Sequence, residues 1–342
     1  MKLTKEWRPV AGAVAVGFPF LVAALALGGC GESPAAEPPA AFHALVTEQP
    51  GILLSAAYTA DGNAIIVGGQ IAGGEGLLLR WDGRSMTTIP TPGAHAFWWV
   101  NGLSPTEMYL AGESGEVHRF DGASLTVVDA GVPATATLFG IWGPSGDELW
   151  TVGGSFSNAG AKRIIRHLTG GQWVAVDSPA DVPAETTYFK VWGADPSDVW
   201  IVGDGGVVLH WDGSTLSRDG RVTGAERFFT VHGCDRQNVW VVGGTGAGEV
   251  RSFDGNGWTS VSAEGAQPLN GVSCAGDDVI VGGAFGYAAR IAGGKLTAIA
   301  TPKEVGDLFI HGIARSAGHT LAVGGDLLAG VGDPYRGFVL EL

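Results

Sequence analysis

The most constraining feature of this 342-residue chain is a segment of about forty residues that recurs seven times. Each copy contains an apolar run that ends in one or two glycines, as in "DVWIVG" and "NVWVVGG". A fixed period of this length is typical of repeat architectures in which each copy forms one supersecondary unit. The recurring tryptophans are therefore predicted to be mostly structural. The glycines that mark the copies are separated by 44, 41, 50, 40, 39 and 42 residues: Gly68, Gly112, Gly153, Gly203, Gly243, Gly282 and Gly324.

Each copy contains four short segments that are expected to form β-strands. A first run such as "YFKVWG" precedes the glycine-ended run, a third run ends in Asp-Gly, as in "VVLHWDG", and a fourth follows at once. Asp-Gly between two strands predicts a tight hairpin in which both central residues have positive φ. Four antiparallel strands per forty residues correspond to one blade of a β-propeller. The sequence therefore predicts an all-β, seven-bladed β-propeller.

The two ends of the repeat region predict how the ring closes. The last copy ends after its third strand, "GFVLEL", and a strand-like segment, "AFHALVTE", precedes the first copy. If the N-terminal strand joins the last blade as its fourth strand, both observations are explained and an exposed sheet edge is removed. The propeller is predicted to span residues 42–342.

The copies resemble the "VWG…DVWxVGxxGxxxHWDG" repeats of bacterial secreted and lipoprotein β-propellers, and are more distantly similar to Kelch repeats through their paired glycines. This resemblance covers residues 42–342 and implies the fold but no particular activity. The first, sixth and seventh copies depart from the pattern, with segments such as "RIAGG" and "AYTADG" in place of the usual motifs.

Residues 1–29 are predicted to be the signal peptide of a lipoprotein. Three basic residues, the last of them Arg8, precede an apolar run without charge that reaches Cys30, a pattern typical of a secretory signal. The end of the run, "LGGC", resembles a bacterial lipobox, which implies that the signal is cut before Cys30 and that this cysteine carries the lipid. An uncleaved transmembrane anchor is the alternative, because the apolar run is long enough to span a bilayer. Residues 30–41, rich in alanine and proline, are predicted to be a flexible tether.

The charge of the chain limits its partners. The formal net charge is −14 at pH 7, and no cluster of lysine or arginine interrupts the acidic character. Because such a surface repels phosphate backbones, nucleic acid is not an expected partner. The predicted lipid anchor makes the membrane a partner and the cell envelope, most directly the outer membrane, the expected location.

Sequence motifs of known catalytic and metal sites are missing. The chain contains no His-Glu-x-x-His, no Gly-x-Ser-x-Gly, no phosphate loop, no calcium loop and no sialidase-type Asp box. The recurring aspartates lie in turns, where short polar side chains cap the backbone. No catalytic residue, metal or cofactor is therefore predicted, and an enzyme is the less favoured class.

Four histidines fall at repeat positions. His167 and His210 occupy a position that holds arginine or serine in other copies, which favours a polar strand face over a ligand set. His232 and His311 align with tryptophans of other copies just before a glycine, near the end of the first strand. Packing between blades is the favoured interpretation of this second pair, and a ring at one mouth of the channel is the alternative.

Loop lengths predict which face of the propeller carries the function. The loops between second and third strands and the connections between blades vary in length, and propeller topology places both classes on one face. Function usually resides on variable loops that a rigid scaffold carries. We therefore expect a non-enzymatic binding or scaffold protein that holds an envelope protein or a glycan on this face; a lyase or hydrolase with its site there is the alternative. The candidate binding residues are the mixed-charge loop residues Lys162, Arg163, Asp333, Tyr335 and Arg336.

Cys234 and Cys274 are one repeat period apart and fall in corresponding first-to-second-strand turns of adjacent blades. An exported location permits oxidation, so a disulfide between them is predicted. Two separate buried thiols are the alternative.

Overall fold

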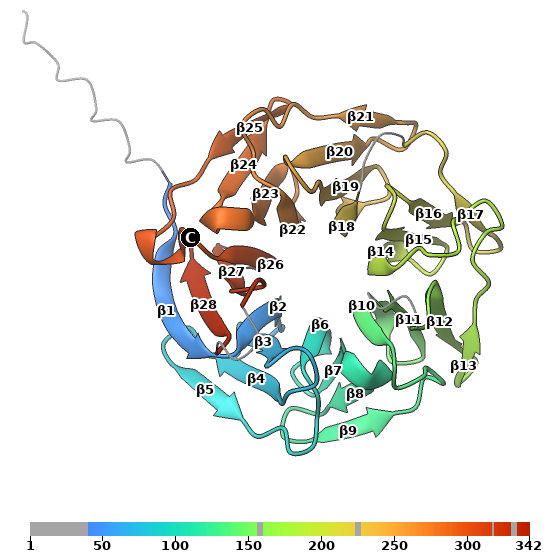
Figure 1. Cartoon of the computed structure of the whole chain (residues 1–342), viewed down its shortest axis with the longest axis horizontal. Coiled ribbons are helices and arrows are strands. Elements are labelled where there is room, and N and C mark those ends of the chain that lie inside the picture. Colours follow the sequence, from blue (N-terminus) through green and yellow to red (C-terminus); the bar gives the residue numbers. More distant parts are fainter. Residues whose placement is uncertain (1–39, 156–159, 223–226, 317, 330–333) are drawn as a thin grey trace, which may run out of the picture. The chain divides into compact units, whose positions relative to one another are not determined.

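The computed structural model describes residues 40–155, 160–222, 227–316, 318–329 and 334–342. Seven four-stranded antiparallel sheets are arranged as blades around a central channel (Figure 1). The prediction of an all-β, seven-bladed propeller with four strands per blade is confirmed. The predicted signal, Cys30 and all but the last two residues of the predicted tether lie outside the described residues. Within the ranges given above, no helix is long and apolar enough to cross a membrane.

Each blade runs from an innermost strand beside the channel to an outermost strand at the rim of the ring. Blade 1 contains β2 (Ile52–Tyr58), β3 (Ala64–Gly69), β4 (Gly76–Trp81) and β5 (Met86–Ile89). Blade 2 contains β6 (Phe97–Ser104), β7 (Glu107–Gly112), β8 (Val117–Phe120) and β9 (Leu125–Val128). Blade 3 contains β10 (Thr137–Ser145), β11 (Glu148–Gly154), β12 (Ile164–Thr169) and β13 (Gln172–Ala175). Blade 4 contains β14 (Tyr188–Asp195), β15 (Asp198–Gly203), β16 (Val208–Trp211) and β17 (Leu216–Arg218).

The remaining blades follow the same order. Blade 5 contains β18 (Phe228–Asp235), β19 (Asn238–Gly243), β20 (Glu249–Phe253) and β21 (Trp258–Ser260). Blade 6 contains β22 (Leu269–Ala275), β23 (Asp278–Gly283), β24 (Ala288–Ala292) and β25 (Lys295–Ala298). Blade 7 contains β26 (Phe309–Ser316), β27 (His319–Gly325), β28 (Arg336–Glu341) and β1 (His43–Pro50). Three single turns of 3-10 helix lie between strands: η1 (Glu113–Gly115), η2 (Ala284–Gly286) and η3 (Lys303–Val305).

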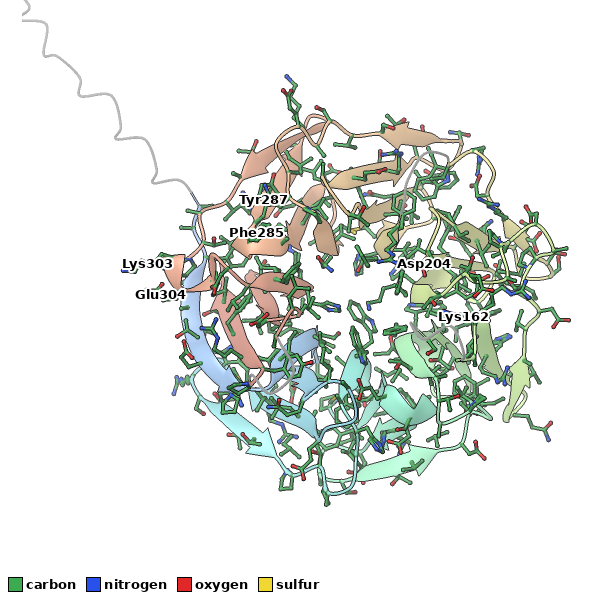
Figure 2. All side chains as sticks on the ribbon, in the orientation of Figure 1. Lys162, Asp204, Phe285, Tyr287, Lys303 and Glu304 are labelled. Carbon is green, nitrogen blue, oxygen red and sulfur yellow. A yellow bond between two sulfur atoms is a disulfide. The ribbon has the colours of Figure 1, made fainter. Side chains whose placement is uncertain are left out.

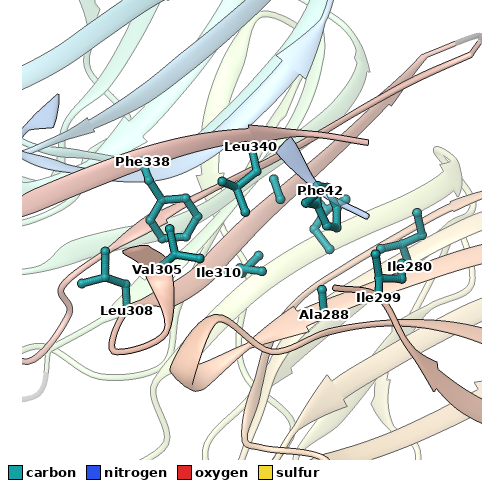
Figure 3. Packing of buried hydrophobic residues seen from close by; sticks show 11 residues of the cluster. Phe42, Ile280, Ala288, Ile299, Val305, Leu308, Ile310, Phe338 and Leu340 are labelled. Atoms are coloured by element: carbon teal, nitrogen blue, oxygen red, sulfur yellow. The ribbon is translucent and has the colours of Figure 1, made fainter. Parts of the chain in front are cut away.

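The ring closes as the ends of the sequence predicted. Strand β1 pairs antiparallel with β28, with His43 opposite Glu341 and Pro50 opposite Arg336. The N-terminal strand is therefore the outermost strand of the last blade, where it lies beside β28 in Figure 1. Phe42, just ahead of β1, is buried with Phe338 in the apolar cluster of blades 6 and 7 (Figure 3).

The core of the propeller lies between the blades. In the described chain, seven clusters of buried apolar side chains are found, one at each contact between neighbouring blades. The second strands are buried along most of their length, and β15 along all of it, because both faces pack on adjacent sheets. This double burial explains their apolar runs, whereas outermost strands such as β5 and β9 are partly exposed to solvent.

The Asp-Gly hairpins differ from the prediction. The glycine of each such turn has φ between 84° and 93°, but the aspartate before it does not have positive φ. Instead, one carboxylate oxygen accepts hydrogen bonds from the backbone N–H groups two and three residues later, at 2.7–2.9 Å. Each loop is thus four residues long and is capped by its first side chain. The four capping residues are Asp82, Asp121, Asp212 and Asp254.

His167 and His210 belong to a structural pair that recurs in the blades. His210 Nε2 donates to Asp198 Oδ1 at 2.6 Å, and its ring stacks on Trp200 with centroids 4.0 Å apart. His167 pairs with Glu148 in the same way and stacks on Trp150. Each pair connects the second strand of a blade to the third, which is a structural role.

Every innermost strand contains a β-bulge near its first residues. The register against the second strand shifts there in all seven blades. A bulge inserts one unpaired residue and re-aims its side chain. We call these residues the bulge collar: Leu54, Trp98, Phe139, Phe189, Phe229, Asn270 and His311.

Candidate functional site

The two faces of the propeller are built from different connections. The loops between second and third strands lie beside the connections between blades, as the bridges of Glu75 with His95 and of Asp204 with Arg227 show. We call this side the variable-loop face. The short turns between first and second strands and between third and fourth strands form the opposite side, the turn face. The channel contains one cavity toward each face.

The cavity toward the variable-loop face, the loop-face cavity, has a volume of about 510 Å³. Six of the seven collar residues line it, all except Leu54. Five of their rings form a series, in which His311 of blade 7 lies beside Trp98 of blade 2 and the other rings belong to the successive blades 3, 4 and 5. The distances between ring centroids are 5.9 Å for His311–Trp98, 4.8 Å for Trp98–Phe139, 5.7 Å for Phe139–Phe189 and 5.4 Å for Phe189–Phe229. The wall is thus largely aromatic.

Lys190 follows the bulge residue of blade 4 and lines the loop-face cavity. Its side chain is buried, its Nζ donates to Phe139 O at 2.8 Å, and it lies 4.4 Å from the centroid of the Trp99 ring. Gly140 of blade 3, which lies between Lys190 and Trp99, leaves room for Lys190, because a Cβ at Gly140 would lie 2.9 Å from the Lys190 Cα. Burial lowers the pKa of the Lys190 ammonium from 10.5 to about 7.

His311 lines the same cavity, which corrects the sequence alignment. The alignment placed it beside His232 near the end of the first strand, but it is a collar residue near the start of β26. Its Nδ1 donates to Leu54 O at 2.5 Å. Burial, with the nearby charge of Lys190, lowers the pKa of His311 to about 3, so the imidazole is neutral near pH 7.

The cavity toward the turn face, the turn-face cavity, has a volume of about 400 Å³ and a different wall. Trp142 packs on Gly193 of the next blade, where an added Cβ would lie 2.5 Å from the ring, and Trp192 packs in the same way on Gly233. His232 follows in this series and lines the cavity; burial lowers its pKa to about 4. The sequence left packing between blades and lining of the channel as alternatives for His232. In the structure, this series of residues does both.

Covalent and ionic contacts also connect blades at the turn face. Cys234 of β18 and Cys274 of β22 are joined by a disulfide, with Cα atoms 5.8 Å apart, inside the range that a bridge requires. Both cysteines lie at the ends of the innermost strands, not in the turns where the sequence placed them. Arg236 and Asp195 form an ion pair at 2.5 Å between blades 5 and 4.

The predicted loop residues do not form one cluster. Lys162 and Arg163 lie in blade 3, where Lys162 donates to Ser155 O and Arg163 Nη1 donates to Val182 O at 3.4 Å (Figure 2). Tyr335 and Arg336 lie in blade 7, which does not neighbour blade 3 in the ring.

Of the blade 7 group, the side chain of Arg336 and the backbone of Tyr335 have partners. Arg336 pairs with Asp307 at 3.2 Å and with Glu48 at 3.8 Å, and Tyr335 O accepts a hydrogen bond from the backbone of Gly51. Asp333 lies outside the described residues. These residues therefore serve local contacts, and the described ones do not line the loop-face cavity.

Large apolar side chains are exposed beside the loop-face cavity. Leu328, in the loop between β27 and β28, lines the cavity and is 76% exposed. Phe285 in η2 is 59% exposed, and its ring lies 6.3 Å from that of Phe309, another lining residue (Figure 2). Phe285 has a φ of 56°, a left-handed conformation that is costly for a bulky residue.

Sequence reasoning missed Lys190, although one signal was present. It is the only charged residue in the first five positions of any innermost strand, inside the otherwise apolar segment "YFKVWG". The collar had no such signal, because the alignment of copies does not show which residue is the bulge.

Searches with this sequence found no matching family model and no matching curated protein. Solved β-propellers are similar in structure. The extracellular domain of a hybrid two-component system from B. thetaiotaomicron has a TM-score of 0.63 and 14% identity over 88% of this chain, which spans 39% of the length of that protein. YCF48 bound to D1 peptide has a TM-score of 0.62 and 15% identity, covering 90% of this chain and 98% of its own. The C-terminal WD40 domain of Sif2 has a TM-score of 0.58 and 10% identity, covering 89% and 99%. At these identities the similarity shows the fold alone.

Proposed function

We propose that this protein is a non-enzymatic binding protein of the cell envelope that holds an apolar polypeptide segment of a partner protein at the loop-face cavity. The observation that carries this proposal is the series of collar rings around a cavity of about 510 Å³. Ligand sites are typically concave, of this size, mostly apolar, and furnished with a few polar groups.

The exposed residues at the mouth extend this apolar surface. Phe285 and Leu328 are two of the four large apolar side chains that are clearly exposed in the described chain, and both lie on the variable-loop face. The other two, Val127 and Val174, lie on the outermost strands β9 and β13. Exposed apolar groups that adjoin an apolar cavity are typical of a surface that a partner covers.

A polypeptide suits this cavity better than a glycan. Sugars need many hydrogen-bonding groups around an aromatic platform, whereas the collar provides three polar groups: the amide of Asn270, the indole N–H of Trp98 and the imidazole of His311, whose Nδ1 is already used. One propeller of similar structure was solved with a peptide bound. That analogy is at the level of the fold and supports the proposal only to that extent.

An enzyme remains the second candidate, and the presence of Lys190 and His311 in one cavity is the observation that favours it. Lys190 can itself exchange a proton near neutral pH, but catalysis would also require a second free acid or base beside the substrate. Glu113 lines the cavity, but its carboxylate accepts hydrogen bonds from the N–H groups of Ala72 and Gly73 at 2.8 and 2.7 Å. We therefore favour binding.

Attachment to the membrane is part of the proposal and rests on the "LGGC" sequence that ends at Cys30. Lipid on this cysteine would keep the propeller at an envelope membrane, most directly the outer membrane. Intact-mass measurement of the mature protein should show the acyl groups, and Cys30→Ala should leave an unprocessed precursor. A mature chain with an unmodified cysteine would contradict the anchor.

The docking proposal is tested by capture of partners after crosslinking in intact envelopes. Phe285→Asn combined with Leu328→Ser removes the apolar mouth, and Val127→Ser combined with Val174→Ser is the matched control on the outermost strands. A partner that the wild type and the control capture, and that the mouth variant loses, supports the proposal. Equal capture by both double variants would exclude the loop-face mouth as the docking site.

A further inference from the structure

Lys190 is unusual among seven structurally equivalent positions. The other blades hold small, polar uncharged or aromatic residues there, so the fold itself does not need a cation at this place: Ser55, Trp99, Gly140, Thr230, Gly271 and Gly312. Burial of a charge without a partner is costly. The seven-fold repeat thus provides an internal comparison, in which Lys190 is an addition to the scaffold.

The surroundings of Lys190 provide no counter-charge. In the described chain no carboxylate forms an ion pair with it, and its one hydrogen bond, to Phe139 O, leaves two N–H groups of the ammonium free. The titratable side chains that share the cavity are Glu113, which is held by two backbone N–H groups, and the neutral His311. A further donor of the collar, Trp98 Nε1, is buried without an acceptor.

We propose that the segment bound in the loop-face cavity carries a carboxylate that pairs with the Lys190 ammonium, next to an apolar or aromatic side chain that packs against the collar rings. This inference rests on the proposed function and names the chemistry of its ligand. A carboxylate oxygen accepts the free N–H groups of Lys190 and neutralises its charge, in a cavity where low polarity strengthens such hydrogen bonds. The carboxylate can belong to a chain terminus or to an acidic side chain.

Three short peptides separate these possibilities in calorimetric titrations of the mature protein. Acetyl-Gly-Phe has a terminal carboxylate, its C-terminal amide has none, and acetyl-Asp-Phe amide has only a side-chain carboxylate. We expect at least one of the two acids to bind the wild type about tenfold tighter than the uncharged amide. Lys190→Met should remove this preference, so that the acids and the uncharged amide bind with similar affinity. Lys190→Thr, which introduces the residue that blade 5 carries, provides a second variant in case the first folds poorly.

Proton uptake gives an independent readout. Because a bound carboxylate favours the charged lysine, binding of an acid at about pH 8 should take up a proton from the buffer, and binding of the amide should not. Equal affinity of acids and amide for the wild type, or a preference that survives in Lys190→Met, would overturn this inference while leaving the docking proposal in place. If none of the three peptides bound the wild type, both proposals would fail.

Discussion

At the turn-face mouth of the channel, several blades pack on or bond to the next blade, whereas at the loop-face mouth most collar side chains line an open cavity. The turn-face mouth has tryptophan rings packed on glycines, a disulfide and ion pairs between blades. The loop-face mouth has aromatic collar residues, an unpaired cation and exposed apolar groups. The same seven strands form both mouths, so the difference arises from a few residues at either end of each strand.

This difference suggests that the two mouths divide stability and binding between them. Changes at the turn-face mouth should lower the stability of the ring and spare binding. Changes at the loop-face mouth should alter binding and leave stability unchanged or higher, because groups kept for binding are often destabilising. Four predictions test this division, beginning with the largest expected effect.

Loss of the Cys234–Cys274 disulfide should destabilise the propeller most. Replacement of both residues by alanine should lower the free energy of unfolding by about 4 kcal/mol, because the bridge closes a loop of one whole repeat. Denaturant unfolding with and without reductant measures this, and peptide binding to the folded double variant should be unchanged. Peptide maps of protein never exposed to reductant must show the bridged pair; recovery of both cysteines as free thiols would rule it out.

Gly193→Ala should cost about 3 kcal/mol, because the new methyl group would lie 2.5 Å from the Trp142 ring and 2.8 Å from Asp198 O. Gly220→Ala is the matched control, since no atom lies within 4 Å of its added Cβ. Both variants can be compared by thermal unfolding. A similar loss of stability in the two would show that contact between tryptophan and glycine is not what joins these blades.

Lys190→Met should stabilise the protein by about 2 kcal/mol at neutral pH, because it removes a buried charge that lacks a counter-ion. This is less than the roughly 4 kcal/mol that the lowered pKa corresponds to, because methionine also loses the hydrogen bond to Phe139 O and the contact with the Trp99 ring. The folded-state pKa of Lys190, about 7, lies below its ordinary value of 10.5. The unfolded chain therefore binds more protons between these values, and wild-type stability should rise with pH across that window. The advantage of the variant should accordingly be full below pH 7 and shrink as the pH approaches 10.5. A difference that does not change with pH would contradict a buried, titrating lysine.

Phe285→Asn should change stability least, with a gain of under about 1 kcal/mol, because asparagine tolerates the left-handed conformation better than phenylalanine. Ser114 in η1 has the same conformation, with a φ of 58°, and Ser114→Asn is the control for backbone relief without loss of an apolar ring. Partner capture should fall for Phe285→Asn alone. If capture fell equally for both variants, the apolar ring of Phe285 would not be the reason.

The architecture was predictable because each copy repeats the same physical signals. Apolar runs of strand length that end in glycine occur seven times and Asp-Gly turns four times, so errors in one copy are corrected by the others. The partner of the N-terminal strand followed from counting strands in the last copy. The repeat period alone was enough to predict that Cys234 and Cys274 are close together, because neighbouring blades place corresponding residues side by side.

The functional site was less predictable because it depends on departures from the repeat. His232 and His311 both precede a glycine, yet they lie toward opposite mouths, because glycine occurs at two positions of the innermost strands: directly after the bulge, as Gly312 does, and near the end of the strand, as Gly233 does. Charge alone drew attention to Lys162 and Arg336, whose side chains are occupied by local partners. In the sequence, Lys190 stands out only because its six counterparts in the other blades are uncharged. Its burial depends on how the folded ring packs and could not be predicted from the sequence.

The pairing of β1 with β28 has a kinetic consequence. The two strands stand at opposite ends of the described chain, and this pairing completes blade 7. During synthesis from the N-terminus, β1 is made first and waits without its partner until the last blade has been made. Each earlier blade forms from consecutive strands and gathers local contacts quickly, whereas closure must await the contact with the greatest separation in sequence. We therefore expect a late folding step in which an open arc of blades becomes a ring, and until then both of its end blades present uncovered sheet faces that a chaperone could bind.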